Sequence, residues 1–360
     1  GKGATLTTSM TIDNTAPEVT YVDGEDGISV TAKDNQYIAA IALLNKNGSA
    51  VLAKEIPGEE AVKGETYTWD LDMTETYGKK FLLAVFDYAG NQSTYEVELE
   101  ESHTGDITGA FLAVSSGKWV AIKDGEVKNL TAVTPLPAGA AYVGGYLFTN
   151  SGTSTTSKYI SVSDMDLIGS PTILYGYRLT NNVPGDLTYS AADETLYQIS
   201  YTSKKSGSKF VYTTILSEVD MTTGEVKSVG TIKGLSEAAL SLTCDTEGNF
   251  YMVELATGKL FTFTRADVEE GKNVTLVGET GWKGNVANNN GAPSIAWNKA
   301  DGMIYQTNHF GTDASQTALL KIDPKTAETT KVCDIPANTT ALVIPDDSTL
   351  PAVLMPDAVK

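Results

Sequence analysis

A pattern of two apolar segments around a polar turn recurs three times in the C-terminal half of the chain and restricts the fold more than any other feature. The copies are residues 187–197, 242–251 and 295–305. They end in Tyr197, Tyr251 and Tyr305, which are 54 residues apart (251 − 197 and 305 − 251). Further alternating segments complete each period, which then holds four short strands, as a β-propeller blade does.

Two less regular units precede the three copies. The unit at 110–133 lacks an initial strand, and a second unit begins with a strand that we expect at 140–147. Residues 340–346 resemble the strand that the unit at 110–133 lacks. Because an open ring would leave two unpaired strand edges, we expect these segments to share one sheet. Counted this way, the propeller has five blades, with six blades as the alternative.

The N-terminal quarter of the chain has a different organisation. Over all 360 residues, 33 glycines, 17 tyrosines and a charged fraction of only 20% favour an all-β protein with many turns. Seven short alternating segments indicate a fibronectin type III-like or immunoglobulin-like sandwich. We expect its strands at 18–22, 28–32, 38–45, 50–56, 66–72, 81–86 and 94–99.

Three stretches of this region resemble a known family. They are 12–17 (Ile-Asp-Asn-Thr-Ala-Pro), 32–40 (Ala-Lys-Asp-Asn-Gln-Tyr-Ile-Ala-Ala) and 86–91 (Phe-Asp-Tyr-Ala-Gly-Asn). They are similar to the fibronectin-like domain downstream of the catalytic domain in lactocepin-type subtilisin-like cell-envelope proteases of Gram-positive bacteria. The resemblance implies a large secreted or wall-associated parent protein and carries over no catalytic residue.

The expected domain order follows from these patterns. Residues 1–12 are predicted to be the tail of a preceding domain, 13–101 the sandwich and 102–107 a linker. Residues 108–346 are predicted to form the propeller, closed by the strand at 340–346, and 347–360 to lead to a further domain.

Net charge and cysteine content restrict the partners. The formal net charge of −19 disfavours nucleic acid and anionic membranes, and no apolar run is long enough for membrane insertion. Cys244 and Cys333 fall in an inner and an outer strand, so we expect no disulfide. We therefore expect an extracellular or cell-wall-associated protein whose partners are neighbouring domains of the parent chain and an extracellular protein, peptide or glycan.

Catalytic motifs are absent from the sequence. His103 and His309 are the only histidines, and no Gly-x-Ser-x-Gly elbow accompanies a serine. A propeller hydrolase acting on polysaccharide would need carboxylates in the central channel. Candidates near inner strands are Asp186, Asp193, Asp245, Asp301 and Asp346, of which the middle three occupy turns where Asp is common. The sequence therefore predicts no catalytic residue, and this hydrolase stays an alternative.

Two groups of polar residues suggest binding sites. Asp13, Asp34 and Asp87 fall in three loops that share one pole of the expected sandwich, and carboxylate oxygens are ligands for a structural calcium ion. The alternative is that these acids only form hydrogen bonds within their loops. A ligand-binding mouth on the propeller is expected around the long connection after 279, from Trp282, Asn285, Asn288, Asn289, Asn290, Asn308 and His309.

These observations predict a non-catalytic accessory segment of a bacterial cell-surface protein, with the sandwich as a spacer and the propeller as an interaction module. A spacer without any ligand is one alternative, and the propeller hydrolase is the other. The regular tyrosines are expected to pack between sheets rather than to bind carbohydrate.

Overall fold

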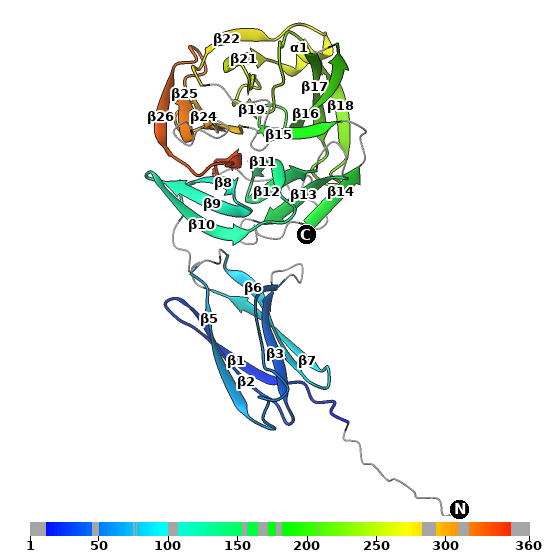
Figure 1. The fold of residues 1–360 in the computed structure, drawn as a ribbon, viewed down its shortest axis with the longest axis vertical. Helices are drawn as coiled ribbons and strands as arrows, with labels where there is room; N and C mark the ends of the chain where they lie inside the picture. Colours follow the sequence, from blue (N-terminus) through cyan, green and yellow to red (C-terminus); the bar gives the residue numbers. More distant parts are fainter. Residues whose placement is uncertain are drawn as a thin grey trace, which may run out of the picture. The chain divides into compact units, whose positions relative to one another are not determined.

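The computed structural model describes residues 12–346, except 45–49, 75, 77, 100–106, 153–156, 165–171, 178–181, 208, 283–292 and 309–316. The chain divides into two compact units, Gly1–Gly105 and Asp106–Lys360 (Figure 1). Strands dominate the described part, which also contains the short helix α1 (Arg265–Glu269). The protein is therefore all-β, as its composition predicts. No helix in the described part is long and apolar enough to cross a membrane.

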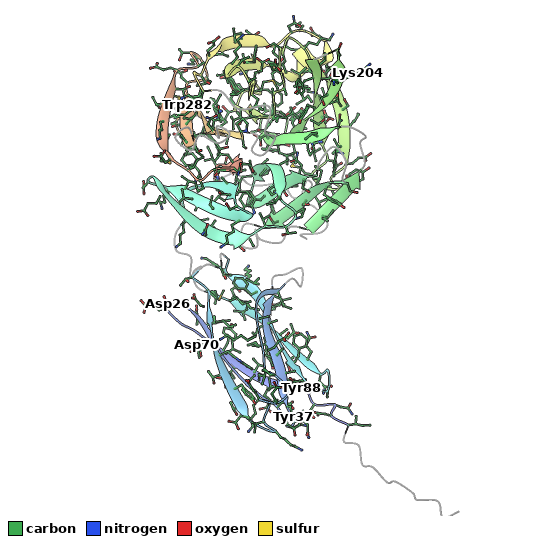
Figure 2. All side chains as sticks on the ribbon, in the orientation of Figure 1. Asp26, Tyr37, Asp70, Tyr88, Lys204 and Trp282 are labelled. Atoms are coloured by element: carbon green, nitrogen blue, oxygen red, sulfur yellow. The ribbon has the colours of Figure 1, made fainter. Side chains whose placement is uncertain are left out.

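The described part of the first unit contains seven strands in two antiparallel sheets. The strands are β1 (Glu18–Asp23), β2 (Gly27–Lys33), β3 (Ile38–Leu44), β4 (Ala50–Glu55), β5 (Thr66–Asp72), β6 (Lys80–Asp87) and β7 (Gln92–Glu98). One sheet has the order β1-β2-β5 and the other β4-β3-β6-β7. Every strand lies within two residues of its predicted bounds. Tyr37 and Tyr88 lie at one end of this unit and Asp26 at the other (Figure 2).

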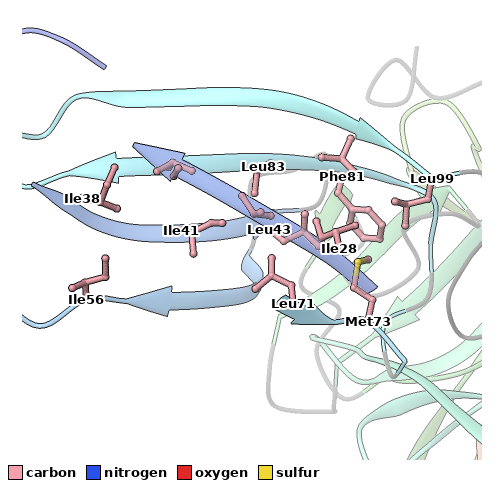
Figure 3. Packing of buried hydrophobic residues seen from close by; sticks show 14 residues of the cluster. Ile28, Ile38, Ile41, Leu43, Ile56, Leu71, Met73, Phe81, Leu83 and Leu99 are labelled. Atoms are coloured by element: carbon pink, nitrogen blue, oxygen red, sulfur yellow. The ribbon is translucent and has the colours of Figure 1, made fainter. Parts of the chain in front are cut away.

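An apolar core joins these two sheets. Ile28 on β2, Ile41 and Leu43 on β3 and Leu83 on β6 are almost completely buried within it (Figure 3). Strand β2 alternates between buried and half-buried residues because successive side chains of a strand point to opposite faces. Burial of one such aliphatic side chain contributes about 1.5–3 kcal/mol, so this core holds the sheets face to face.

Five four-stranded antiparallel sheets make up the described part of the second unit. Four of them follow the chain in order. Their strands are β11 (Pro137–Val143), β12 (Tyr146–Ser151), β13 (Lys158–Asp164) and β14 (Thr172–Tyr177); β15 (Val183–Ser190), β16 (Thr195–Ser206), β17 (Lys209–Val219) and β18 (Val226–Ile232); β19 (Thr243–Cys244), β20 (Phe250–Val253), β21 (Lys259–Phe263) and β22 (Thr275–Glu279); and β23 (Ile295–Asn298), β24 (Met303–Asn308), β25 (Ala318–Ile322) and β26 (Thr329–Asp334). This arrangement is that of a β-propeller.

The fifth sheet combines segments from distant parts of the chain. Its strands are β8 (Phe111–Ser115), β9 (Lys118–Lys123), β10 (Glu126–Ala132) and β27 (Thr340–Val343), in the order β10-β9-β8-β27. Thr340 pairs with Val114 and Val343 with Leu112, both antiparallel. The last described strand therefore covers the edge of β8 that would otherwise be unpaired.

Contacts between neighbouring sheets involve the repeated tyrosines. The ring of Tyr197 meets that of Phe250 edge-on at 4.9 Å, and Tyr251 stacks on Trp297 at 6.0 Å. Tyr305 packs against Phe111 of the fifth sheet, with ring centroids 4.6 Å apart. Each tyrosine thus packs against an aromatic residue of the next sheet, which confirms the prediction that these rings join adjacent sheets.

Two local features differ from the sequence-based expectations. The segment predicted as one strand at 140–147 is the end of β11 and the start of β12, joined by a tight turn. Gly144 and Gly145 both have positive φ, 54° and 92°, as the two central residues of such a hairpin turn require. Helix α1 was also not expected, and it begins at a capping box in which Thr264 and Asp267 exchange hydrogen bonds.

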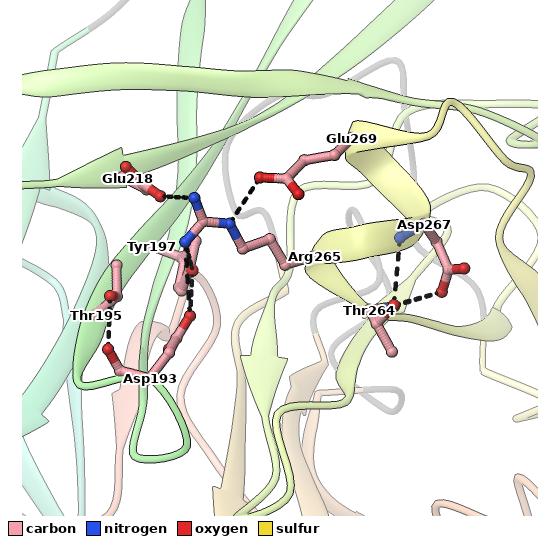
Figure 4. A network of polar contacts seen from close by, with 8 residues as sticks. All are labelled: Asp193, Thr195, Tyr197, Glu218, Thr264, Arg265, Asp267 and Glu269. Atoms are coloured by element: carbon pink, nitrogen blue, oxygen red, sulfur yellow. Dashed lines mark hydrogen bonds and ion pairs between the residues drawn. The ribbon is translucent and has the colours of Figure 1, made fainter.

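Arg265 of helix α1 connects two neighbouring sheets. Its guanidinium group contacts Glu218 of β17 at 2.5 Å and Glu269 at 2.9 Å, and it donates a hydrogen bond to the Tyr197 hydroxyl at 3.2 Å (Figure 4). The Tyr197 hydroxyl in turn donates to Asp193. The hydrogen bond to Glu269 raises the pKa of Arg265 above its ordinary value.

Candidate functional site

The inner strands of the second unit form a closed ring. Strand β11 contacts β15, β15 contacts β19, β19 contacts β23, β23 contacts β27, and β27 returns to β11. Any channel along the axis of this unit is therefore bounded by these five strands, and the residues they direct inward decide its chemistry.

Asp186 of β15 lies at the centre of this ring and is almost completely buried, with 1% of its surface exposed. Its carboxylate accepts hydrogen bonds from the backbone N–H groups of Leu242 (3.3 Å) and Ile295 (3.0 Å) and from the Ser294 hydroxyl (3.0 Å). Ser294 Oγ also accepts the backbone N–H of Leu342 at 2.8 Å. Desolvation raises the pKa of Asp186 well above its ordinary value.

The hydrogen bonds of Asp186 and Ser294 join several of the inner strands. They connect β15, the segment just before β19, the start of β23, and β27. A buried carboxylate without a cation is costly unless its oxygens are hydrogen-bonded, and here neutral donors and a raised pKa reduce that cost. We conclude that Asp186 closes the centre of the ring.

A cavity of about 150 Å³ lies beside this closure, between all five inner strands. Its wall includes Leu187, Ile295 and Leu342. Leu187 follows Asp186 in the chain, Ile295 donates its backbone N–H to Asp186, and Leu342 donates its backbone N–H to Ser294 Oγ. Its polar and aromatic lining consists of Tyr142, Thr188, Tyr189, Thr243, Asp245, Thr246, Trp297, Lys299 and Asp346. The cavity therefore combines two carboxylates, one lysine and aromatic surfaces.

The five candidate carboxylates have different surroundings. Asp193 and Asp301 do not line the cavity, because they accept hydrogen bonds from Tyr197 and Tyr305 in the turns between strands. Asp245 lines the cavity. Its oxygens accept hydrogen bonds from the N–H groups of Glu247 and Asn249, the Asn249 amide and the Tyr251 hydroxyl.

The Tyr–Asp pairs also fix the charge state of the tyrosines. Burial, together with the nearby Asp245 carboxylate, raises the pKa of Tyr251 to about 12. Burial likewise raises the pKa of Tyr305, which donates to Asp301 at 2.8 Å. These hydroxyls are therefore donors over the physiological range, and each of the three aspartates accepts a hydrogen bond from the tyrosine that follows its turn.

The predicted ligand-binding mouth is only partly within the described residues. Asn285, Asn288, Asn289, Asn290 and His309 lie outside them. Trp282 is half-buried. Its backbone N–H donates a hydrogen bond to Thr280 Oγ1, and the Thr280 hydroxyl donates one to the Trp282 carbonyl. Asn308 is buried at the end of β24, where its side-chain oxygen accepts a hydrogen bond from Gln306. Neither Trp282 nor Asn308 lines the cavity between the inner strands.

Sequence reasoning missed most of the cavity wall. Lys299, Tyr142 and Tyr189 were not singled out, although each lies at or near the end of an inner strand. Tyr142 and Tyr189 lie at the end of the first strand of their sheets, and Lys299 lies in the turn that follows such a strand. This position next to the first turn of each sheet is the signal that could have identified them.

The two cysteines remain free, as predicted. Cys244 is buried, Cys333 is half-buried, and neither forms a disulfide. Desolvation raises the pKa of the Cys244 thiol to about 12. Cys244 borders the cavity, but a thiol with this pKa is not a nucleophile at neutral pH.

The first unit holds a group of three acids. Asp13, Asp34 and Asp87 each direct a carboxylate oxygen to within 4.8 Å of the other two. The structure thus brings together the three acids that the sequence placed at one pole. Asp34 and Asp87 are each only 4% exposed.

Comparisons with known proteins find no matching family model and no matching curated protein. Solved structures with weak similarity include a gluconolactonase from Xanthomonas campestris (12% identity, TM-score 0.39, 91% of this chain and 87% of that chain). A periplasmic gluconolactonase from Pseudomonas aeruginosa is also similar (10%, 0.34, 88% and 100%). So is an auxiliary nutrient-binding protein from Bacteroides thetaiotaomicron (11%, 0.33, 88% and 70%).

These comparisons correct one prediction and leave another as it was. The prediction that this chain is not an enzyme is contradicted by the gluconolactonases among the similar structures, and it is withdrawn. No family model or curated protein supports the likeness to cell-envelope proteases, which stays a resemblance carried by three short stretches.

Proposed function

We propose that the second unit is a five-bladed propeller hydrolase whose site is the cavity between β11, β15, β19, β23 and β27. The observation that carries this proposal is the presence of two carboxylates, Asp245 and Asp346, in the wall of one cavity bordered by all five inner strands. Hydrolysis of a glycosidic bond commonly uses two carboxylates, one that transfers a proton and one that stabilises the reacting centre.

The proposal gives the two carboxylates different roles. Asp245 is held in one orientation by four donors, so it positions and stabilises. Asp346 follows β27 and is the proton-transferring group. Lys299 supplies positive charge, which stabilises an oxyanion that develops in the same cavity.

The shape of the cavity restricts the substrate. Asp186 closes the ring next to the cavity, so a polymer cannot pass through the axis of the unit. Tyr142, Tyr189 and Trp297 give the wall aromatic surfaces, which suit the apolar faces of a sugar. The proposed substrate is therefore a small glycoside or the terminal residue of a glycan.

Turnover of a panel of chromogenic p-nitrophenyl glycosides tests this proposal. Asp346→Asn is expected to lower kcat/KM by about 100-fold or more, the usual contribution of a general acid or base. Asp124→Asn is the matched control, because Asp124 is exposed on the β9–β10 turn and Asn tolerates its positive φ. Lack of turnover by the wild type, or equal turnover by Asp346→Asn, would reject this assignment.

We further infer that the first unit is a fibronectin III-like sandwich of a secreted protein. The sheet orders β1-β2-β5 and β4-β3-β6-β7 support this assignment, because they place seven strands in two sheets around one core. The net charge of −19 supports a location away from nucleic acid.

A further inference from the structure

We propose that Asp13, Asp34 and Asp87 of the first unit bind one calcium ion. The three acids come from separate segments: the chain before β1, the residue after β2, and the last residue of β6. Pairing of β6 with β3 aligns Asp87 with Ile38, close to the loop that carries Asp34. The fold thus gathers the three carboxylates, whose oxygens lie within 4.8 Å of one another.

Two of the carboxylate oxygens lack a partner. Asp34 Oδ2 accepts the backbone N–H of Gln36 at 2.5 Å, and Asp13 Oδ1 accepts that of Thr15 at 3.1 Å. The second oxygen of each group, Asp34 Oδ1 and Asp13 Oδ2, is buried without any hydrogen bond. Asp34 is 4% exposed, so bulk solvent hardly reaches this carboxylate. A buried polar atom of this kind normally has a partner.

The charges in this cluster are also unbalanced. None of the ion pairs between described residues includes Asp13, Asp34 or Asp87. Like charges at this distance repel one another strongly where the dielectric constant is low. Buried charges are therefore paired with an opposite charge or coordinate a metal. A divalent cation between the three carboxylates supplies that charge and satisfies both unpaired oxygens.

The donors and their spacing favour calcium. All three ligands are carboxylate oxygens, which hard cations prefer to the nitrogen and sulfur ligands typical of zinc. Calcium binds oxygens at about 2.3–2.6 Å in a flexible shell, so ligand oxygens up to about 5 Å apart fit around one ion. Magnesium requires near-ideal octahedral geometry and usually retains several waters, which a buried protein cluster cannot supply.

Asn91 connects two members of the cluster and orients them. Its backbone N–H and its amide each donate to Asp87, at 2.7 Å, and the amide also donates to the Asp13 carbonyl at 3.1 Å. The Ser93 hydroxyl donates to the Pro17 carbonyl in the same segment. Calcium would therefore fix the chain before β1 to the β6–β7 hairpin and stiffen this end of the sandwich.

Calorimetric titration of Ca²⁺ into the EDTA-treated full chain tests the proposal. We expect one ion bound per chain and an affinity at least 10-fold lower for Asp34→Asn, which removes one charge but retains an acceptor for Gln36. Asp70→Asn is the matched control, because Asp70 is exposed on β5 and pairs with Ser29, about 17 Å along β2 from Asp34. Far-UV circular dichroism checks that both variants fold.

Terbium luminescence provides a second measurement. Tyr88 follows Asp87 directly in the chain, and its backbone N–H donates to the Tyr37 carbonyl at 3.0 Å, so both rings lie near the cluster and can sensitise Tb³⁺ bound in place of calcium. We expect luminescence that Ca²⁺ displaces, and its loss in a folded Asp87→Asn variant. Absence of both heat and luminescence in the wild type would overturn the proposal, as would equal weakening by Asp70→Asn. Binding of Mg²⁺ as tight as that of Ca²⁺ would overturn the assignment to calcium.

Discussion

Asp186 shows how one buried residue can serve several strands. Its carboxylate is enclosed by β15, β23 and the segment before β19, and all of its hydrogen-bond donors are neutral. Desolvation raises the pKa of Asp186 and outweighs these hydrogen bonds, which lower it, so the folded state favours the protonated acid. Between the pKa of the unfolded chain, about 3.9, and the higher pKa of the folded state, the folded state binds more protons. The free energy of unfolding consequently falls as pH rises through this interval.

Substitution of Asp186 tests this role. Asp186→Asn is expected to remove that pH dependence and to be at least as stable as the wild type at pH 8, because the amide keeps the shape without the charge. Asp186→Ala leaves the Leu242 and Ile295 N–H groups unpaired, each at a cost of about 1–3 kcal/mol. Urea unfolding at pH 5 and pH 8 measures both effects. A wild type and an Asp186→Asn variant with the same pH dependence would contradict the assignment.

Residue roles were predictable from the sequence only where the period fixed them. The 54-residue spacing placed Tyr197, Tyr251 and Tyr305 between sheets, and their ring contacts agree. Asp186 and Ser294 occupy equivalent positions two periods apart (294 − 186 = 108), but their residue types differ and Leu240 stands at the position between them. The period therefore relates the two positions, but no residue pattern in the repeats indicates that their side chains form a hydrogen bond.

Strand β27 is the element that completes the second unit. It follows the last repeated sheet in the chain but pairs with β8, and Leu342 on it is 1% exposed. Leu342 packs in a cluster with Ala113, Tyr305 and Leu319, which belong to two different sheets. The sequence allowed this pairing to be anticipated, because the unit at 110–133 lacked one strand. The same reasoning failed at Gly144 and Gly145, where a turn interrupts an otherwise apolar run.

Truncation of Leu342 would leave an empty space in the apolar cluster around it and should lower the stability of the whole second unit. Leu342→Ala is expected to lower the free energy of unfolding by about 2–5 kcal/mol, the usual cost of such a truncation in a core. Val332→Ala on the outer strand β26 is the matched control, because Val332 is 45% exposed, and its cost should stay below about 0.5 kcal/mol. Urea unfolding followed by tryptophan fluorescence measures both. Equal losses for the two variants would show that β27 is not an integral part of the sheet.

At the scale of the whole molecule, the order of the strands was easier to predict than the function. Alternation and turn residues locate strands directly, since both are local properties of the chain. The cavity instead depends on Lys299, Asp346 and Tyr142, which the ring brings together from distant positions. Lys299 stands one period after Asp245 and two periods after Ala191, which also line the cavity. The period therefore marks the position, but the residue type changes from repeat to repeat, and Asp346 and Tyr142 lie outside the three copies.

Separate cores should make the two units respond separately to substitution. The cluster around Leu43 draws only on residues of the first unit, and the cluster around Leu342 only on residues of the second. Leu43→Ala should therefore lower the melting temperature of one calorimetric transition by about 8 °C or more, from a loss of about 2 kcal/mol or more in a domain of this size. Leu342→Ala should lower only the other transition. A shift of both transitions by either variant would show that the two units unfold as one cooperative structure.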